Sequence, residues 1–514
     1  MDRPTVLAAV DVGTNSFHLL VARVAGTGRF EVLAREKEVV RLGSGSGDMK
    51  RLAPDAVDRG VAALARFRQV AEIFGADLRA VATSAVREAE NRADFLRRAR
   101  DEAGVDVDVV SGVEEARLIH LGVLQALPVF DRRLVLVDIG GGSTEVVVGQ
   151  QGEVLEARSL KLGAIRLTDR FFAEEPVRRK AVDECRRYVR SMVIGVAREV
   201  GRLGFEVAAG SSGTILNVAE MVQARRGGPP LRSVSGATIT RAELDAVVAS
   251  LVKAHTAKDR LKVPGLDPRR ADIILGGAVL LEQVFAELGI TEMVVADSAL
   301  REGILLDTIQ RRQDEGLHHL RDLRERSVRH LADIYPEERE HGEHSAELAL
   351  QLYEGLADRH RLPEVCEEWL EAAALLANVG LFIAHSRHHL HAYYIIRNAE
   401  HLTGFTDSEV EVIAQVARYH RKSAPKPSHH EFAALDAEDQ HVVRVLAGIL
   451  RIAIALDRSH AGVVRGVSVA RSGRRVAIHL KVDGDAGLEV YTAEQRAGLL
   501  EDALGVRVRF VVDE

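Results

Sequence analysis

The sequence predicts an α/β protein of two similar lobes, followed by a helical region and a small α+β tail. The strongest observation is an internal repeat, because V-D-V-G-T-N-S at 10–16 returns as V-D-I-G-G-G-S at 137–143. Each copy stands between two apolar strand candidates, which predicts strand, turn and strand. Strand and helix patterns then alternate to about residue 305, as in α/β folds. Two related units suggest lobes that face each other across a cleft.

The rest of the chain has a different pattern. From about 310 to 460 it is helical and rich in histidine, and the last 50 residues carry strand candidates around a helix at 493–503. The 514 residues exceed one core, since domains usually hold about 100–200 residues. We therefore predict two lobes at 1–125 and 126–306, a helical domain at 310–460 and a small α+β domain at 461–514.

Composition excludes several classes of protein. The net charge is −7 and the two cysteines are far apart, so neither sequence-independent nucleic-acid binding nor a disulfide framework is expected. The first residues do not have the pattern of a signal peptide, and no apolar stretch reaches the roughly 20 residues of a membrane span. We expect a cytoplasmic protein without membrane or specific nucleic-acid partners.

The repeated turn is suited to phosphate. Backbone N–H groups of a glycine-containing turn, where φ > 0 is accessible, can form an anion-binding nest. Asp11 and Asp138 would repel a phosphate, so they make sense as groups that hold Mg²⁺ or orient its water. A single copy is better explained as a hairpin with an Asp turn residue. Two copies in equivalent context favour phosphate binding, with further donors from Thr14, Asn15, Ser16, Ser143 and Thr144.

Two further segments could contact the same anion. The loop Gly210-Ser211-Ser212-Gly213-Thr214 follows a short strand and opens a helix, which suits an anion at a helix N-terminus, although a plain cap explains it equally well. Arg87 follows another strand candidate and has the planar, permanently charged group that binds phosphate oxygens. Surface arginines are common, so this residue alone indicates little.

Glu115 is a candidate general base. Ser111 and Glu114 have the spacing of a capping box, which gives Glu114 a structural role and leaves Glu115 unexplained. Its neighbours three and four positions on are Leu118 and Ile119, so Glu115 lies on the apolar side of the helix, where desolvation would raise its pKa. Such a carboxylate facing a phosphate cleft could activate water. The alternative is a solvated glutamate paired with arginine.

Taken together, these segments resemble the exopolyphosphatase and guanosine pentaphosphate phosphatase family. The resemblance covers roughly residues 5–306 and rests on six motifs in the same order. They are D-V-G-T-N-S-F-H-L at 11–19, A-T-S-A-V-R at 82–87, S-G-V-E-E-A-R at 111–117, D-I-G-G-G-S-T-E at 138–145, G-S-S-G-T at 210–214 and L-R-E-G-I-L at 300–305.

The resemblance implies two ribonuclease-H-like lobes of the ATPase fold shared by actin, heat-shock chaperones and sugar kinases. It implies Glu115 as the catalytic base, and Asp138 and Glu145 as residues that serve the metal and the water. The metal would be Mg²⁺ or Mn²⁺, with K⁺ as an additional candidate, and the protein would be a homodimer. The phosphate-binding residues it implies are Asp11, Gly13, Thr14, Asn15, Ser16, Arg87, Gly140, Gly141, Gly142, Ser143, Ser211, Ser212, Gly213 and Thr214.

The helical region resembles HD phosphohydrolases with a degenerate metal site. Ala377 and Asn378 replace the His-Asp pair of the L-L-H-D-I-G motif, and Ile454 stands where the last Asp ligand would be. His344 and His420 fit the rest of the pattern, but too few ligands remain for the usual pair of metals. The histidines at 385, 388, 389 and 391 suggest another metal site, although helix ends and polar packing explain them better.

The expected function is exolytic release of orthophosphate from inorganic polyphosphate, with Glu115 deprotonating water. The same motifs serve conversion of guanosine pentaphosphate to the tetraphosphate, so they do not separate these substrates. A sugar kinase on the same fold is disfavoured by the motif at 111–117 and the short 210–214 loop. A non-catalytic nucleotide or polyphosphate sensor is disfavoured by Glu115 and the two turns.

Overall fold

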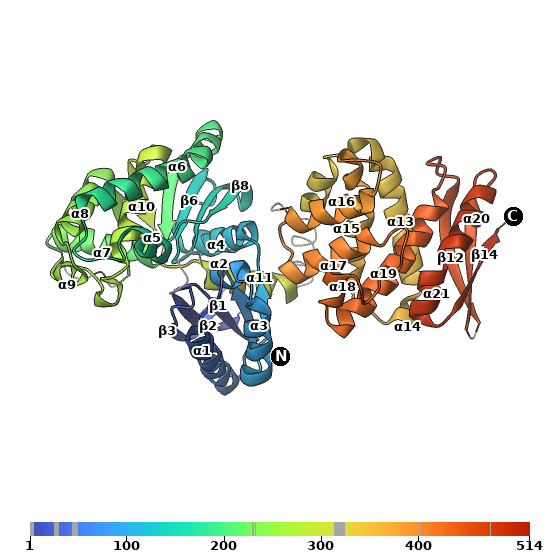
Figure 1. The fold of residues 1–514 in the computed structure, drawn as a ribbon, viewed down its shortest axis with the longest axis horizontal. Coiled ribbons are helices and arrows are strands. Elements are labelled where there is room, and N and C mark those ends of the chain that lie inside the picture. Colours follow the sequence, from blue (N-terminus) through green and yellow to red (C-terminus); the bar gives the residue numbers. More distant parts are fainter. Residues whose placement is uncertain are drawn as a thin grey trace. The chain divides into compact units, whose positions relative to one another are not determined.

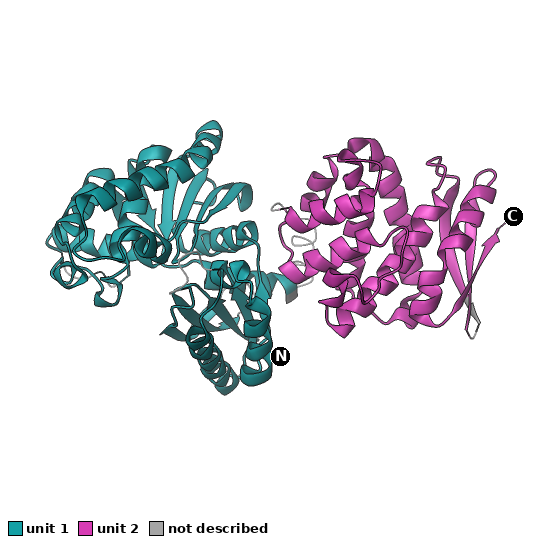
Figure 2. Ribbon diagram, in the orientation of Figure 1, with its two compact units in different colours: residues 1–317 teal, residues 318–514 magenta. Residues whose placement is uncertain are grey.

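The chain forms two compact units, residues 1–317 and 318–514 (Figure 2). The expected boundaries at 125/126 and 460/461 are finer than this division and stay predictions. The first four residues, where no signal peptide is expected, and 313–323, near the expected start of the helical region, lie outside the described residues. The computed structural model describes residues 5–24, 30–43, 50–228, 231, 233–312, 324–399, 402–472 and 474–513.

The first lobe is a five-stranded sheet in the order β3-β2-β1-β4-β5. β1, β2 and β3 are antiparallel neighbours, whereas β4 pairs parallel with β1 and with β5. Its outer face packs against helices around Phe17, Leu64 and Phe95. The elements are β1 (Val6–Val12), β2 (Ser16–Val24), β3 (Phe30–Val39), α1 (Pro54–Ile73), β4 (Asp77–Ala82), α2 (Ser84–Glu88), α3 (Arg92–Ala103) and β5 (Val107–Val109).

The second lobe repeats this topology. Its sheet contains the order β8-β7-β6-β9-β11, with β10 added at the β11 edge. Strand directions match those of the first sheet, and every residue of β6 is buried, as in a strand covered on both faces. The elements are β6 (Leu134–Ile139), β7 (Thr144–Gln150), β8 (Glu153–Leu160), α5 (Ala164–Phe171), α6 (Arg179–Leu203), β9 (Val207–Ser211), α7 (Ser212–Arg225), β10 (Thr238–Thr240), α8 (Arg241–Lys253), α9 (Ala257–Arg260), η1 (Pro268–Arg270), α10 (Ile274–Leu288) and β11 (Glu292–Val295).

This shared order confirms the predicted pair of ribonuclease-H-like lobes (Figure 1). Two helices, α4 (Gly112–Ala126) and α11 (Leu300–Arg312), join them. α4 follows the first sheet but packs on β7 and β8, whereas α11 follows the second sheet but packs on β1, β2 and β4. A Cβ added to Gly122 would lie 2.0 Å from the Ala299 carbonyl oxygen, and one added to Gly303 would lie 1.8 Å from that of Leu118. The backbones of α4 and α11 therefore come into direct contact at these two glycines.

The second unit has a helical part and a three-stranded sheet in the order β12-β13-β14, around one apolar core. The helix expected at 493–503 is two helices that separate at Ala497, beside Gly498, a residue of low helix propensity. The elements are η2 (Pro336–Glu338), α13 (Arg339–Gly355), α14 (Ala357–His360), α15 (Val365–Leu376), η3 (Val379–Phe382), α16 (His388–Asn398), α17 (Asp407–Arg418), α18 (His430–Ala433), α19 (Ala437–Leu456), β12 (Val464–Ser472), β13 (Arg475–Val482), α20 (Gly487–Arg496), α21 (Gly498–Leu504) and β14 (Arg507–Val512).

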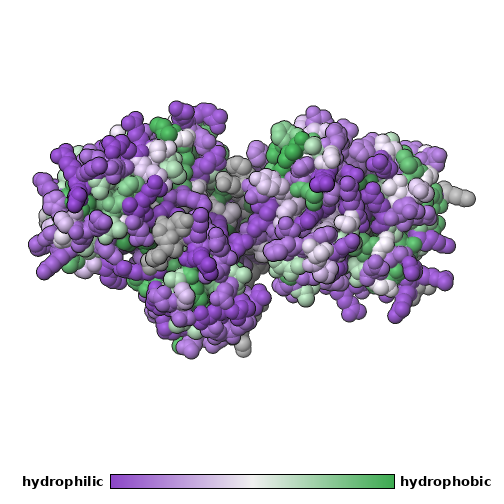
Figure 3. All heavy atoms as spheres, in the orientation of Figure 1, coloured by the Kyte–Doolittle hydropathy of each residue, from purple (hydrophilic) through white to green (hydrophobic). Residues whose placement is uncertain are grey.

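The face drawn in Figure 3 is mostly hydrophilic, with apolar groups in small scattered areas. Within the described ranges, no helix combines the length and the apolar character needed to cross a membrane.

Candidate active site

Each copy of the repeated turn joins the first two strands of its sheet, so Asp11 and Asp138 occupy equivalent places. In the first lobe, Asp11 on β1 lies opposite His18 on β2, and His18 lies opposite Lys37 on β3. Because directly opposed residues share a face of the sheet, these three form one row. Asp11, His18 and Lys37 all line the same cavity.

The second lobe has the corresponding row of Asp138, Glu145 and Ser159 on β6, β7 and β8. The Ser159 hydroxyl donates to Glu145 Oε1 at 2.8 Å. Asp138 lines the cavity, whereas Glu145 and Ser159 are not among its lining residues. The internal repeat is therefore preserved in the strand register, but its two rows differ in chemistry.

In these turns glycine is needed because a side chain would collide with neighbouring atoms. The sequence had instead predicted that glycine supplies a positive φ. Neither Gly13 nor any glycine at 140–142 has a left-handed φ. A Cβ on Gly13 would lie 2.8 Å from the Ser16 carbonyl oxygen. One on Gly141 would lie 3.3 and 3.4 Å from the Cβ atoms of Thr14 and Asn15, so the two turns face each other closely.

The third loop contacts the second Asp. The hydroxyls of Ser211 and Ser212 donate to Asp138 Oδ2 at 2.5 and 2.8 Å. Ser212 is the first residue of α7 and has φ 68°, a region that non-glycine residues enter mainly where the surroundings impose it. Ser212, Gly213 and Thr214 line the cavity, whereas Ser211 is fully buried beneath it.

The cavity between the lobes has a volume of about 160 Å³. It brings together most residues that the sequence pointed to, but four candidates are not among its lining: Arg87, Thr144, Glu145 and Ser211. The Thr144 hydroxyl is buried and donates to the Leu162 carbonyl. The predicted residues that line it are Asp11, Gly13, Thr14, Asn15, Ser16, Glu115, Asp138, Gly140, Gly141, Gly142, Ser143, Ser212, Gly213 and Thr214.

Glu115 enters the cavity from the first turn of α4. The Ser111 hydroxyl accepts the Glu114 backbone N–H at 3.1 Å, and the Glu114 carboxylate binds Arg117, so Glu114 has the structural role expected of it. Glu115 is only 5% exposed. Burial raises the pKa of its carboxyl group, and the neighbouring Arg87 acts in the opposite direction.

Arg87 lies against Glu115 and not along the cavity wall. Its Nη1 donates to Glu115 Oε2 at 2.8 Å and to the Val110 carbonyl at 3.1 Å. In this structure Arg87 therefore orients the carboxylate, and its expected contact with a phosphate stays a prediction. The sequence alternative of a Glu–Arg pair is correct about the partner, but the glutamate is buried and not solvated.

Sequence reasoning missed the cationic wall of the cavity, formed by Lys37, Arg270 and Arg301. They come from β3, from η1 and from α11, so only the fold brings them together. Arg301 does stand in the L-R-E-G-I-L motif, which is the one signal available. Its Nη1 lies 3.1 Å from His18 Nδ1. Burial and Arg301 lower the pKa of His18 to about 3, so the ring is neutral.

Four carboxyl groups lie close together here, of which those of Glu115, Asp138 and Glu145 are buried and that of Asp11 is half-buried. Burial, reinforced by the charge of Glu115, raises the pKa of Asp11 to about 8. Burial also raises the pKa of Asp138, and burial together with the charges of Glu115 and Asp138 holds the pKa of Glu145 well above its usual range. This repulsion is what a divalent cation would relieve, and carboxylate oxygens are the ligands that Mg²⁺ prefers. The residues present therefore fit a metal.

The second unit contains a cavity of about 250 Å³, lined among others by Asn378, Ile454 and His420. These are positions of the degenerate HD-like pattern. His344 does not join them, because its Nε2 lies 2.9 Å from the Val464 carbonyl oxygen. In its place His341 lines the cavity. The sequence analysis did not single out His341, although it also belongs to the helix that carries His344.

Comparison with known protein families identifies the family of the chain. The Ppx/GppA phosphatase family matches residues 20–312, and domain III of the Ppx/GppA phosphatases matches residues 323–491. The chain belongs to the Ppx/GppA phosphatase family. The second match covers most of the second unit, so both units of this Ppx/GppA protein have counterparts in the family.

Solved structures agree with this assignment. An exopolyphosphatase from Cytophaga hutchinsonii is 29% identical, with a TM-score of 0.56 over 60% of this chain and 99% of that chain. A Ppx/GppA family member from Aquifex aeolicus is 25% identical, with a TM-score of 0.52 and the same coverage. An exopolyphosphatase-like protein is 30% identical, with a TM-score of 0.54 and again the same coverage. This Ppx/GppA protein therefore extends well beyond the part that these structures share.

Proposed function

We propose that the protein is an exopolyphosphatase that hydrolyses the terminal phosphate of inorganic polyphosphate. The observation that carries the proposal is the position of Glu115, a buried carboxylate that enters a cavity walled by two phosphate turns and by cationic side chains. Phosphoryl transfer depends mainly on positioning and on electrostatic stabilisation, and this cavity supplies groups for both.

The chain's own residues would perform the following steps. Backbone N–H groups of the turns at 13–16 and 140–143, with Arg270 and Arg301, hold the terminal phosphate. Glu115, oriented by Arg87, accepts a proton from a water molecule whose oxygen attacks the terminal phosphorus in line. The P–O bond to the next phosphate breaks, and orthophosphate leaves together with a chain one unit shorter.

Asp138 and Glu145 would hold Mg²⁺ or Mn²⁺. The ion supplies charge neutralisation to the phosphoryl oxygens and acidity to a bound water. The Ser211 and Ser212 hydroxyls hold Asp138, and the Ser159 hydroxyl holds Glu145, so the two carboxylates are fixed in position. K⁺ is a further candidate cation, tested by adding it to the Mg²⁺ assay.

Lys37 is expected to set the alkaline limit of activity. Lys37 is exposed at the cavity wall, but partial desolvation there, together with the charges of Arg270 and Arg269, lowers the pKa of Lys37 to about 8, while Asp267 acts in the opposite direction. The ammonium group binds anions below that pH and loses its charge above it, so kcat/KM should fall as the pH rises through about 8. Arginine stays charged in this range, so Lys37→Arg should remove the fall. Equal profiles for both proteins would contradict this.

Guanosine pentaphosphate is the alternative substrate, because the same cavity chemistry serves its terminal phosphate. The deciding experiment measures orthophosphate release with Mg²⁺ from long-chain polyphosphate and from guanosine pentaphosphate side by side, for wild type and Glu115→Gln. Faster Glu115-dependent release from polyphosphate supports the proposal, and faster release from the nucleotide replaces it. Tight binding without release from either would indicate a sensor.

The remaining expectations are proposals about context. We propose a homodimer, tested by light scattering on the eluted protein, and a cytoplasmic location, tested by fractionation of cells. If polyphosphate contacts the protein over many phosphates, its affinity should fall steeply with salt, by analogy with other polyanions. A nucleotide held mainly at its terminal phosphate would show a weaker dependence.

A further inference from the structure

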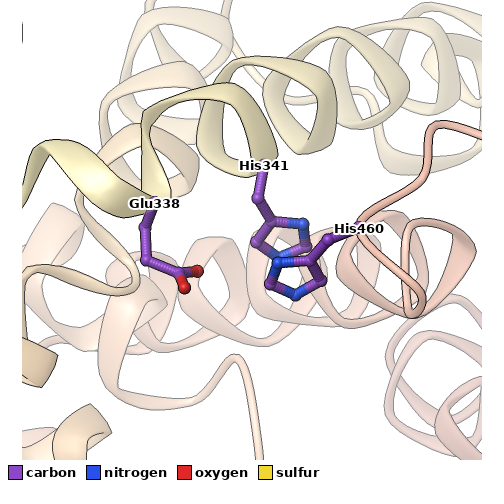
Figure 4. Close-up of side chains that lie close together, drawn as sticks. All are labelled: Glu338, His341 and His460. Carbon is purple, nitrogen blue, oxygen red and sulfur yellow. The ribbon is translucent and has the colours of Figure 1, made fainter.

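A carboxylate and two imidazoles converge in the second unit (Figure 4), whereas the residues of the candidate active site belong to the first unit. Glu338 ends η2, His341 lies in the first turn of α13, and His460 lies between α19 and β12. One ligand atom of each residue lies within 4.8 Å of the other two. Among the described residues, these three form the group whose ligand atoms lie close enough together to bind a metal ion. The histidines at 385–391 do not form such a group.

His341 is oriented as a metal-binding histidine would be. Its Nδ1 lies 2.6 Å from Asp457 Oδ2, and the other oxygen of Asp457 accepts the Gly462 N–H at 3.1 Å. Both His341 and Asp457 are buried. A carboxylate on Nδ1 fixes the ring orientation and the tautomer, which leaves the Nε2 lone pair for a cation. The hydrogen bond thus prepares the ligand before any ion binds.

His460 is held over His341 by an unusual backbone. Its φ is 54°, in the left-handed region, and its ring stacks on that of His341 with 3.8 Å between centroids and 3° between planes. Residues held in sparsely populated conformations cluster at functional sites. Because the two rings are stacked, a shared ion requires the exposed His460 ring to rotate so that its nitrogen points to the ion beside His341.

Glu338 supplies the negative ligand. Asn378 Nδ2 donates to its Oε2 at 2.8 Å, which holds the carboxylate toward the cavity. Asn378 stands where HD phosphohydrolases have the Asp of their His-Asp pair, so Glu338 brings a carboxylate to a place from which one has been lost. Glu338, His341 and His460 all line the cavity of about 250 Å³, through which an ion can enter.

The geometry points to a divalent transition-metal ion of the zinc class bound by Glu338, His341 and His460, with a fourth position open to solvent. Two imidazoles and one carboxylate suit Zn²⁺, whereas Mg²⁺ prefers oxygen ligands alone. Glu338 and the buried Asp457 supply two negative charges that balance the ion. The opposing positive charges of the same cavity are those of Arg421, Arg458 and Arg496. The bound ion would connect the start of α13 to the loop after α19, and so stabilise the second unit.

The test uses the full chain, stripped with a chelator and then given Zn²⁺. Bound zinc is counted by mass spectrometry after desalting, and affinity is measured by competition with a chromophoric chelator. Wild type should bind one equivalent that His460→Ala loses, and Asp457→Asn should weaken binding by about 10–100-fold. The thermal transition of wild type should rise with Zn²⁺, and that of His460→Ala should not.

Two controls separate this site from other ligands. His344→Ala removes a histidine of the same helix that faces elsewhere. His388→Ala removes a histidine of the run that lines the same cavity but lies outside the group of three. Both variants should bind zinc as wild type does. Zinc bound by the active-site carboxylates would remain bound in His460→Ala. It is therefore subtracted when the zinc content of this variant is compared with that of wild type. Equal binding by wild type and His460→Ala, or no zinc in wild type, would overturn the proposal, as would loss of the equivalent in His388→Ala alone.

Discussion

Replacing Glu115 by glutamine is expected to lower kcat for orthophosphate release by about 10²–10⁴-fold, the usual contribution of a general base. Glutamine has nearly the same shape but accepts no proton from water. The phosphate-binding groups remain, so KM should change much less than kcat. The measurement is steady-state phosphate release from polyphosphate, with binding of the substrate followed separately.

Stability serves as the internal control for this variant. Glu115→Gln leaves Arg87 without its charged partner, but it also relieves the repulsion from Asp138. These effects oppose each other, so the thermal transition should shift little. Glu72→Gln, an exposed glutamate on α1 paired with Arg68, should behave as wild type. Near-wild-type turnover by a correctly folded Glu115→Gln protein would exclude Glu115 as the base.

Replacing Asp307 by asparagine is expected to destabilise the first unit by about 3–5 kcal/mol, the usual cost of breaking a buried ion-pair network. The Asp307 carboxylate is 1% exposed and binds Arg79 at 2.6 Å, Arg117 at 2.6 Å and Arg311 at 2.8 Å. Asparagine would leave three guanidinium groups around a neutral side chain. The measurement is calorimetry, with a fall of roughly 5–8 °C in the transition of that unit.

Acid unfolding provides a second test of how much Asp307 stabilises the protein. Its three arginines, led by Arg117, hold the pKa of Asp307 well below its usual range despite burial. The stabilisation is therefore complete above the pKa of the unfolded chain, about 3.9, and is lost as the pH falls through the lower folded value. Asp307→Asn should lack this acid-sensitive component. Arg98→Gln, which breaks exposed ion pairs with Asp58 and Glu102, should change the stability little, because solvent screens such pairs.

The sequence was a good guide wherever local pattern determines the structure. The two turns were found because each lies between apolar strands, and Glu115 was separated from Glu114 because a helix cap has a fixed spacing. The paired lobes followed from the repeat. In each case the information lies within a few residues along the chain.

The remainder depended on contacts between distant segments. Arg87 and Glu115 are 28 residues apart, and no local pattern says that the arginine orients the glutamate in place of facing the cavity. Lys37 lies on a strand whose register decides its face, since a shift of one residue would turn it away. His341 was passed over for His344 because only the helix packing distinguishes them.

The exchange of α4 and α11 between the two sheets means that neither lobe is a separable piece of protein. A fragment ending near residue 125 would keep α4 but lack α11, whose absence exposes apolar residues on the inner face of β1 and β2. The complementary fragment would lack the helix that covers β7 and β8. Each fragment alone should aggregate, whereas the two produced together should reassemble, because each carries the cover that the other needs.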